Sequence, residues 1–226
     1  MDVAAAFAEA DAAFIAAANA ERAVQEKRYL KSALRFHGAS LPVIREVAKR
    51  FGKLSRQDLG AFARRLWESE WHEHRALAVV LVERQAKVLT PDDLGWLIDL
   101  VRTSFTWAYV DSLAIHTIGA ILTRHPESLG VLRAWAADPD FWVRRTALLA
   151  TLLELRAGRG DPELFAEIAV PMLTEREFFI RKAIGWVLRD TAKKRPGWVQ
   201  VFVDGHEMSG LTRREALRGV ERATRA

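Results

Sequence analysis

A short sequence pattern recurs four times along the chain at nearly constant spacing. Each copy starts with an aromatic residue, at Trp71, Trp107, Trp142 and Phe179, and continues through polar or charged groups into an apolar stretch. The copies start 35 to 37 residues apart, which is enough chain for two antiparallel helices and lies between the tetratricopeptide and HEAT periods. Because one such unit cannot bury its apolar face alone, neighbouring units must stack. We therefore expect a superhelical solenoid of antiparallel HEAT-like helix pairs.

The rest of the sequence agrees with an all-α fold. It has no alternating β-branched runs, and Ala, Leu, Arg and Glu dominate the periodic stretches. Several helix starts are marked. At Thr90-Pro91-Asp92-Asp93, for example, a cap residue precedes a proline and two acidic residues near the positive end of the helix dipole. No linker divides the sequence, so we expect one domain over residues 1–226, with the starts of the second helices on a concave, DNA-binding face.

Composition limits the classes of protein to which the chain can belong. Half of its 226 residues are hydrophobic and 28% are charged, which is enough for a substantial core. No run approaches the roughly 18 apolar residues of a membrane span. The acidic residues Asp2, Glu9 and Asp11 near the start are unlike the basic beginning of a secretory signal. We expect a cytoplasmic monomer, associated with the nucleoid of a bacterial-type cell through DNA, and with no membrane partner.

Trp107 and Asp111 are four residues apart, so on a helix they lie on one face, one turn from each other. A strongly apolar segment follows Asp111, and a carboxylate at the start of such a helix is costly to desolvate without a partner. One interpretation is a structural ion pair with Arg144 or Arg145 of the next repeat. The other is a binding site in which an aromatic face and a carboxylate hold a cationic ligand. The spacing leaves both interpretations open.

Basic residues form several clusters that a solenoid would bring to its concave surface. Basic groups interleaved with aromatic residues suit a phosphate backbone with nearby bases, although an isolated cluster is more often a solvated helix face. The net charge of +5 is compatible with this function without proving it. The predicted DNA-binding residues are Tyr29, Lys27, Arg28, Lys31, Arg144, Arg181, Lys182, Lys193, Lys194, Arg213 and Arg214.

The sequence gives little support for a metal site or for a cysteine or serine nucleophile. The chain has no cysteine, which excludes disulfides, thiolate zinc sites and a thiol nucleophile. His72-Glu73-His74 looks like a metal triplet, but histidines two residues apart on a helix point in different directions, and this is not the spacing of zinc peptidases. Phosphate loops and serine-nucleophile motifs are missing as well. We expect neither a metal ion nor a cofactor.

Several stretches of the sequence resemble the AlkD-like DNA glycosylases, a family built from HEAT-like repeats. They are spread over nearly the whole chain in the order that the family has, and the fourth is the most specific. They are Tyr29-Leu30-Lys31 through Phe36-His37-Gly38 to Pro42, Trp107-Ala108-Tyr109-Val110-Asp111, Trp142-Val143-Arg144-Arg145-Thr146-Ala147, Glu177-Phe178-Phe179-Ile180-Arg181-Lys182-Ala183-Ile184-Gly185-Trp186, and the tail Thr212-Arg213-Arg214-Glu215-Ala216-Leu217.

The resemblance implies a base-excision repair enzyme that hydrolyses the N-glycosidic bond of cationic N3- and N7-alkylated purines in duplex DNA. It also implies that the base is not flipped into a pocket. Asp111 would stabilise the sugar oxocarbenium ion and position the attacking water. Trp107 and Trp186 would flank the deoxyribose of the lesion, Arg145 would hold a phosphate, and Tyr29 would belong to the DNA-facing surface.

Two alternatives remain at the level of sequence. The segment from Leu30 to Arg35 departs from the family pattern, in which many members have Met followed by Lys and Asn. The family also contains relatives that bind unusual DNA structures with little or no glycosylase activity, so a non-catalytic binder of branched or damaged DNA is one alternative. The other is a solenoid that binds a peptide on its concave face.

Overall fold

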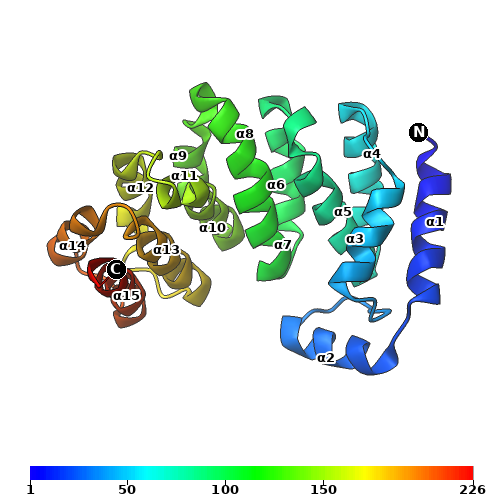
Figure 1. Ribbon diagram of the computed structural model, residues 1–226, viewed down its shortest axis with the longest axis horizontal. Coiled ribbons are helices and arrows are strands. Elements are labelled where there is room, and N and C mark those ends of the chain that lie inside the picture. Colours follow the sequence, from blue (N-terminus) through cyan, green and yellow to red (C-terminus); the bar gives the residue numbers. More distant parts are fainter. Residues whose placement is uncertain (226) are drawn as a thin grey trace. The chain divides into compact units, whose positions relative to one another are not determined.

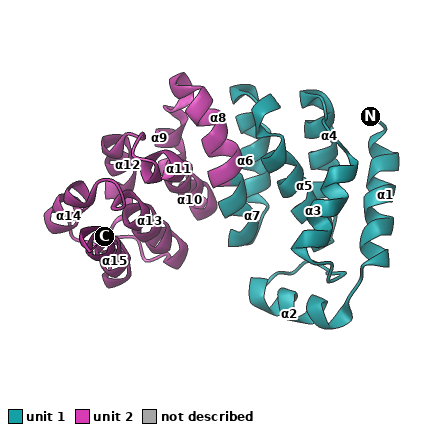
Figure 2. Cartoon of the chain, in the orientation of Figure 1, with its two compact units in different colours: residues 1–113 teal, residues 114–226 magenta. Residues whose placement is uncertain are grey.

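The computed structural model describes residues 1–225, which are helical throughout apart from turns and one isolated backbone bridge between Arg35 and Trp71 (Figure 1). The predicted all-α fold of paired helices is therefore confirmed. The chain forms two compact units, Met1–Leu113 and Ala114–Ala226 (Figure 2). Their division falls inside a continuous helical run, and the single domain expected over residues 1–226 stays a prediction.

The first unit contains three helix pairs and one inserted helix. Helix α4 and helix α5 form a hairpin, α3 packs on α5, α1 contacts α3, α4 and α5, and α7 packs on α5. The helices are α1 (Val3–Ala16), α2 (Ala20–Leu30), α3 (Leu41–Arg50), α4 (Arg56–Trp67), α5 (His72–Arg84), α6 (Leu94–Arg102) and α7 (Trp107–Ser112), with 3₁₀ turns at Ala86–Val88 and Pro91–Asp93.

Helix α5 is the centre of this unit. Its residues from Ala76 to Val82 are all buried, as expected for a helix that has neighbours on every side. The inserted helix α2 has no buried residue and connects α1 to α3 along the chain. No single helix among residues 1–225 is long and apolar enough to cross a membrane, although α1 and α2, bent by 108°, satisfy length and composition together.

The second unit repeats the same plan. Helix α13 packs on α10, α11 and α15, while α9 packs on α10 and α14 on α15. The π-helical turn Leu113–Ile118 continues α7 into this unit. The helices are α8 (Gly119–Arg124), α9 (Val131–Ala136), α10 (Phe141–Leu149), α11 (Leu152–Arg156), α12 (Pro162–Ala169), α13 (Phe178–Thr191), α14 (Pro196–Gly205) and α15 (Gly210–Thr224), with 3₁₀ turns at Pro126–Ser128 and Val170–Met172.

The helix starts correct the register of the repeat. The residues that cap the second helices are Ser40, Trp71, Thr106, Asp140, Glu177 and Ser209. Trp71 is therefore a cap residue, whereas Trp107 is the first residue of its helix and Trp142 the second. The recurring aromatics mark each helix start to within two residues but are not equivalent positions. The cap residue sets the start because its side-chain oxygen accepts an otherwise unpaired backbone N–H, as Thr106, Asp140 and Glu177 do here.

The fourth residue after the cap is an arginine in several second helices, and it ties the helix to the preceding loop. Arg75 donates to the carbonyl of Ser69 at 3.0 Å, Arg144 to that of Asp138 at 2.7 Å and Arg181 to that of Glu175 at 2.7 Å. Each acceptor lies six residues earlier in the chain. The fifth position carries Arg45, Ala76, Asp111, Arg145, Lys182 and Arg214.

A buried carboxylate fixes the segment between α2 and α3. Glu73 is fully buried, and its oxygens accept the backbone N–H groups of His37 at 3.1 Å, Gly38 at 2.7 Å and Ala39 at 3.2 Å. Gly38 has a φ of +82°, and a Cβ there would lie 2.0 Å from the backbone oxygen of Asn19. The Glu73 carboxylate thus accepts from three backbone N–H groups, two of them buried, that the loop cannot pair for itself.

Candidate functional site

Trp107 lies at the edge of a cavity of about 330 Å³ in the first unit. Its ring meets that of Tyr29 edge to face, with 5.7 Å between the ring centroids. Tyr29 is 70% exposed at the end of α2, and Trp107 is half-buried. Helices α2, α3, α5 and α7 all contribute to the wall, and the charged or aromatic lining residues are Glu26, Tyr29, Arg45, His72, Glu83, Trp107 and Tyr109.

The loop before α7 positions Trp107. Thr103 is held from two sides, because Trp67 donates to its hydroxyl and Arg75 to its carbonyl, each at 2.9 Å. Ser104 is buried and donates to the carbonyl of Leu100 at 2.8 Å. Buried Thr106 then caps α7. These contacts fix the direction in which α7 starts and so the place of the indole.

Three polar groups in the cavity wall have environments set by burial. The Tyr109 hydroxyl bonds Nδ1 of His72, and Phe36 stacks on the other side of the His72 ring at 4.5 Å. Burial lowers the pKa of His72 to about 4 and raises that of Tyr109, so both are neutral near pH 7. Burial also raises the pKa of Glu26, although Arg22 opposes that shift. The part of the aromatic wall formed by His72 and Tyr109 is therefore uncharged.

Asp111 lies one turn after Trp107 on α7 and is half-buried. Ser112, the next residue, donates to Glu83 across the cavity wall at 2.7 Å. The π-helical turn starts directly afterwards, at Leu113. Such turns are rare in proteins as a whole, and those that occur often lie at functional sites. The structure thus keeps Trp107 and Asp111 on one short helix that changes its hydrogen-bonding pattern immediately beyond them.

Trp186 and Asp190 form a second tryptophan–aspartate pair at the same spacing, in α13. The indole Nε1–H of Trp186 donates to Asp190 at 3.2 Å, and Arg156 and Lys193 donate to the same carboxylate at 2.8 and 3.0 Å. Asp190 is 4% exposed. Its burial would raise its pKa, but Lys193 and Arg156 hold that pKa below its ordinary value. The predicted site residue Trp186 is therefore oriented by a fixed anion.

Several residues predicted to bind DNA have protein partners in the structure. Arg144 makes two bonds to Glu175, at 2.8 and 2.9 Å, so this proposed partner of Asp111 is bound within the second unit. Arg145 is only 4% exposed, donates to the carbonyl of Phe179 and lies over its ring. Lys182 bonds Glu215 at 3.0 Å. Their roles in DNA binding stay predictions.

Other predicted residues have open surfaces. Lys27, Arg28 and Lys31 are exposed at the end of α2, beside Tyr29, and Lys194 and Arg214 are exposed in the second unit. Two more are partly engaged. Lys193 is paired with Asp190 but 56% exposed, and half-buried Arg213 donates to the carbonyl of Val203 at 2.9 Å. Of the predicted set, the α2 residues are therefore the basic cluster that the structure brings to Trp107.

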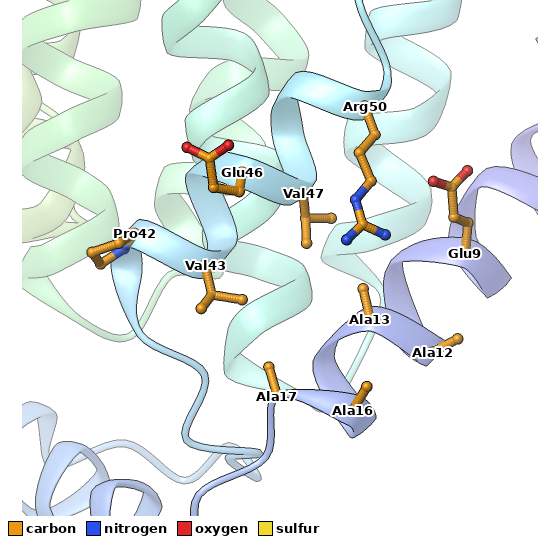
Figure 3. A pocket seen from close by; sticks show the side chains of 10 residues that line it. All are labelled: Glu9, Ala12, Ala13, Ala16, Ala17, Pro42, Val43, Glu46, Val47 and Arg50. Atoms are coloured by element: carbon orange, nitrogen blue, oxygen red, sulfur yellow. The ribbon is translucent and has the colours of Figure 1, made fainter.

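A larger cavity of about 670 Å³ lies elsewhere in the first unit, between α1 and α3 (Figure 3). Figure 3 shows Ala13, Ala16 and Ala17 on one side and Val43 and Val47 on the other. Glu9, Glu46 and Arg50 supply the charged groups of its lining. Among residues 1–225, no group of three or more histidine, aspartate or glutamate side chains is placed to hold a metal ion. The His72-Glu73-His74 triplet instead serves three separate contacts, since His74 bonds Ser69 at 2.7 Å.

Sequence reasoning missed some residues of this site. The spacing that singled out Trp107 and Asp111 also joins Trp186 to Asp190, so that pair was open to detection. Phe105 could not be detected from the sequence, because no glycine or asparagine marks the left-handed backbone that it adopts, with φ of +52°.

Comparison with known proteins places these observations in context. The family model described as DNA alkylation repair enzyme matches residues 10–220. No curated protein is a significant match. A solved structure described as a predicted DNA alkylation repair enzyme from Enterococcus faecalis has a TM-score of 0.81 and 24% identity, covering 88% of this chain and 94% of that one. AlkD2 from Streptococcus mutans has a TM-score of 0.60 and 16% identity, covering 90% and 96%. At these sequence identities, the similarity to the solved structures supports the fold alone.

Proposed function

Since this chain belongs to the family of DNA alkylation repair enzymes, we propose that it is a DNA glycosylase that hydrolyses the N-glycosidic bond of cationic N3- and N7-alkylated purines in duplex DNA. The observation that carries the proposal is the pairing of an accessible aromatic edge, Trp107 against Tyr29, with the carboxylate of Asp111 one helical turn away. An aromatic face and a carboxylate together suit a developing sugar cation.

The reaction needs little acid catalysis. When the bond between C1′ and the purine nitrogen breaks, its electron pair goes to the purine, and the positive charge of the base is cancelled. The sugar becomes an oxocarbenium ion, which Asp111 stabilises, and water adds to C1′ and loses a proton. Because an alkylated purine leaves as a neutral molecule, no group has to protonate it. A single carboxylate is therefore sufficient, and the base need not enter a pocket.

The basic residues supply the duplex with phosphate contacts in this proposal. Lys27, Arg28 and Lys31 are exposed beside Tyr29, and each phosphate contact releases counterions and makes binding salt-dependent. In the second unit, the proposal assigns Trp186 and Arg145 to contacts with the DNA backbone. The carboxylate of Asp190 holds the indole of Trp186 through its N–H, which preorganises this aromatic contact.

The test is release of free base from duplexes that carry 7-methylguanine, 3-methyladenine or one bulky purine adduct. Asp111→Asn should lower the rate of release by about 10²–10³, the usual effect of removing one preorganised electrostatic group, while duplex binding persists. Asp99→Asn, at an exposed carboxylate on α6, is the matched control and should release base at the wild-type rate.

Normal release by Asp111→Asn would refute the assigned mechanism. If the wild-type chain releases no base from any of the three duplexes, it is not a glycosylase for these lesions. Salt-sensitive binding to branched or bulged DNA without any release would then identify the non-catalytic DNA binder instead.

A further inference from the structure

Phe105 is the most exposed of the large hydrophobic residues next to the candidate site. Its side chain is 72% exposed, and its backbone has a φ of +52°. A positive φ is strained for a bulky aromatic residue, which clashes with its own backbone there. The chain therefore holds a large apolar group in water and in an unfavourable conformation, two residues before Trp107. Neither feature benefits folding.

The residues on both sides of Phe105 are anchored in the fold. Its neighbours Ser104 and Thr106 are each only 2% exposed, and Thr103 is bound from both Trp67 and Arg75. A strained backbone persists only when the surrounding contacts over-determine it, and such strain gathers at functional sites. The anchored residues on both sides of Phe105 meet that condition, so its backbone is held in the conformation that exposes the ring.

The second strained residue lies at the same site. Within residues 1–225, Lys31 and Phe105 are the non-glycine residues with positive φ, at +50° and +52°. Lys31 follows Tyr29 by two residues and Phe105 precedes Trp107 by two, and the rings of Tyr29 and Trp107 are in contact. Lys31 is the left-handed C-cap that ends α2, which is a usual helix ending. Phe105 caps no helix in this way, so its strain is the feature that needs an explanation.

We propose that Phe105 is a wedge that inserts into the base stack of duplex DNA beside the lesion. This inference rests on the proposed function. Apolar side chains that enter a base step unstack it partly and open the duplex locally, and aromatic rings replace the lost stacking. Exposed Lys27, Arg28 and Lys31 on α2 next to this site provide the charge that a polyanionic duplex requires, which favours DNA over a protein surface as the occupant.

The wedge gives this enzyme a way to weaken stacking at the damaged step without extruding the base. It makes Phe105 a positioning residue, because it acts on the duplex and not on the bond that breaks. Its effect should be confined to duplex substrates, in which there is a stack to open.

The experiment uses a duplex with a single abasic-site analogue flanked by 2-aminopurine, whose fluorescence rises when it is unstacked. Wild-type protein should raise the fluorescence on binding. Phe105→Ala and Phe105→Gly should abolish most of the rise and weaken binding by about 10-fold, whereas Phe105→Leu, which keeps an apolar wedge, should retain most of it. Because glycine tolerates φ of +52°, Phe105→Gly should melt no lower than wild type, which separates loss of function from loss of fold.

Phe178→Ala is the matched control, since Phe178 is 53% exposed in the second unit without a strained backbone. It should leave the fluorescence rise unchanged. An undiminished rise with Phe105→Ala, or an equal loss with Phe178→Ala, would overturn the wedge. A Phe105-dependent rise with no base release in the glycosylase assay would keep the wedge and reject the glycosylase. Failure of the wild-type chain to bind this duplex would overturn the wedge, whereas base release alone decides whether the chain is a glycosylase.

Discussion

Substitution of Glu73 by glutamine tests how the loop between α2 and α3 is held. The carboxylate is fully buried and accepts three backbone N–H groups, of His37, Gly38 and Ala39. Glutamine has the same shape but one acceptor oxygen. If that oxygen keeps the bonds to Gly38 and Ala39, the amide NH₂ is turned toward the N–H of His37, and two donors face each other.

The magnitude follows from the three bonds. One charge-assisted bond, with a net contribution of about 1.5–3 kcal/mol, is lost, and the two others weaken to neutral bonds of about 1 kcal/mol each. Relief of the buried charge offsets part of this loss. We expect the free energy of unfolding to fall by about 3 kcal/mol, which lowers the Tm by about 6–12 °C for a chain of this size.

Urea unfolding followed by circular dichroism measures the effect, with a constant m-value as the sign that stability alone has changed. Glu70→Gln is the matched control. Glu70 lies three residues earlier and pairs with Arg35 at 2.9 Å, with both side chains more than half exposed, so its loss should cost less than about 1 kcal/mol. Equal midpoints for the two variants would refute the role assigned to Glu73.

Three further substitutions test other contacts. Gly38→Ala should lower the free energy of unfolding by more than about 3 kcal/mol, because the added Cβ would lie 2.0 Å from a backbone oxygen. Its control, Gly52→Ala, has φ of +57° but open space around it and should lower that free energy by only about 1–2 kcal/mol, as thermal unfolding can measure. Burial lowers the pKa of His72 from 6.5 to about 4, so between these pH values the unfolded chain binds a proton that the folded chain does not, and the free energy of unfolding falls as the pH drops from 6.5 to 4. His72→Phe should remove up to about 3 kcal/mol of this pH-dependent loss of stability, and an unchanged pH profile of stability would contradict the assignment. Arg144→Ala breaks a largely buried ion pair and should lower the free energy of unfolding by about 3 kcal/mol. Arg133→Ala breaks a pair that is half exposed and should lower it by less than about 1 kcal/mol. Equal losses in urea unfolding would show that burial does not decide the strength of these pairs.

The repeat was predictable because its period is set by chain length. Two helices and their turns need about as many residues in every unit, so the aromatics near each start recur even though Trp71, Trp107 and Trp142 hold different positions. Their register was not predictable from the aromatics, since cap residues such as Thr106 and Asp140 set the helix starts.

Tertiary partners were less open to prediction than helix positions. The sequence offered Arg144 and Arg145 equally as partners for Asp111, but only the fold shows that Arg144 is taken by Glu175, 31 residues away. The left-handed turn at Phe105 depends on contacts from two other helices. Local sequence carries no sign of conformations that distant residues impose.

The arginines at the fourth position of the second helices have a consequence for how such a protein can change. Arg75, Arg144 and Arg181 each attach their helix to its own loop, so the next position carries none of that attachment. That next position differs between repeats: Ala76 is buried, Arg145 donates to the carbonyl of Phe179, and Arg214 is exposed. In these three repeats the link between helix and loop is therefore independent of the residue that follows it. In α15 the following residue, Arg214, is exposed, so it can change while the helix keeps its attachment.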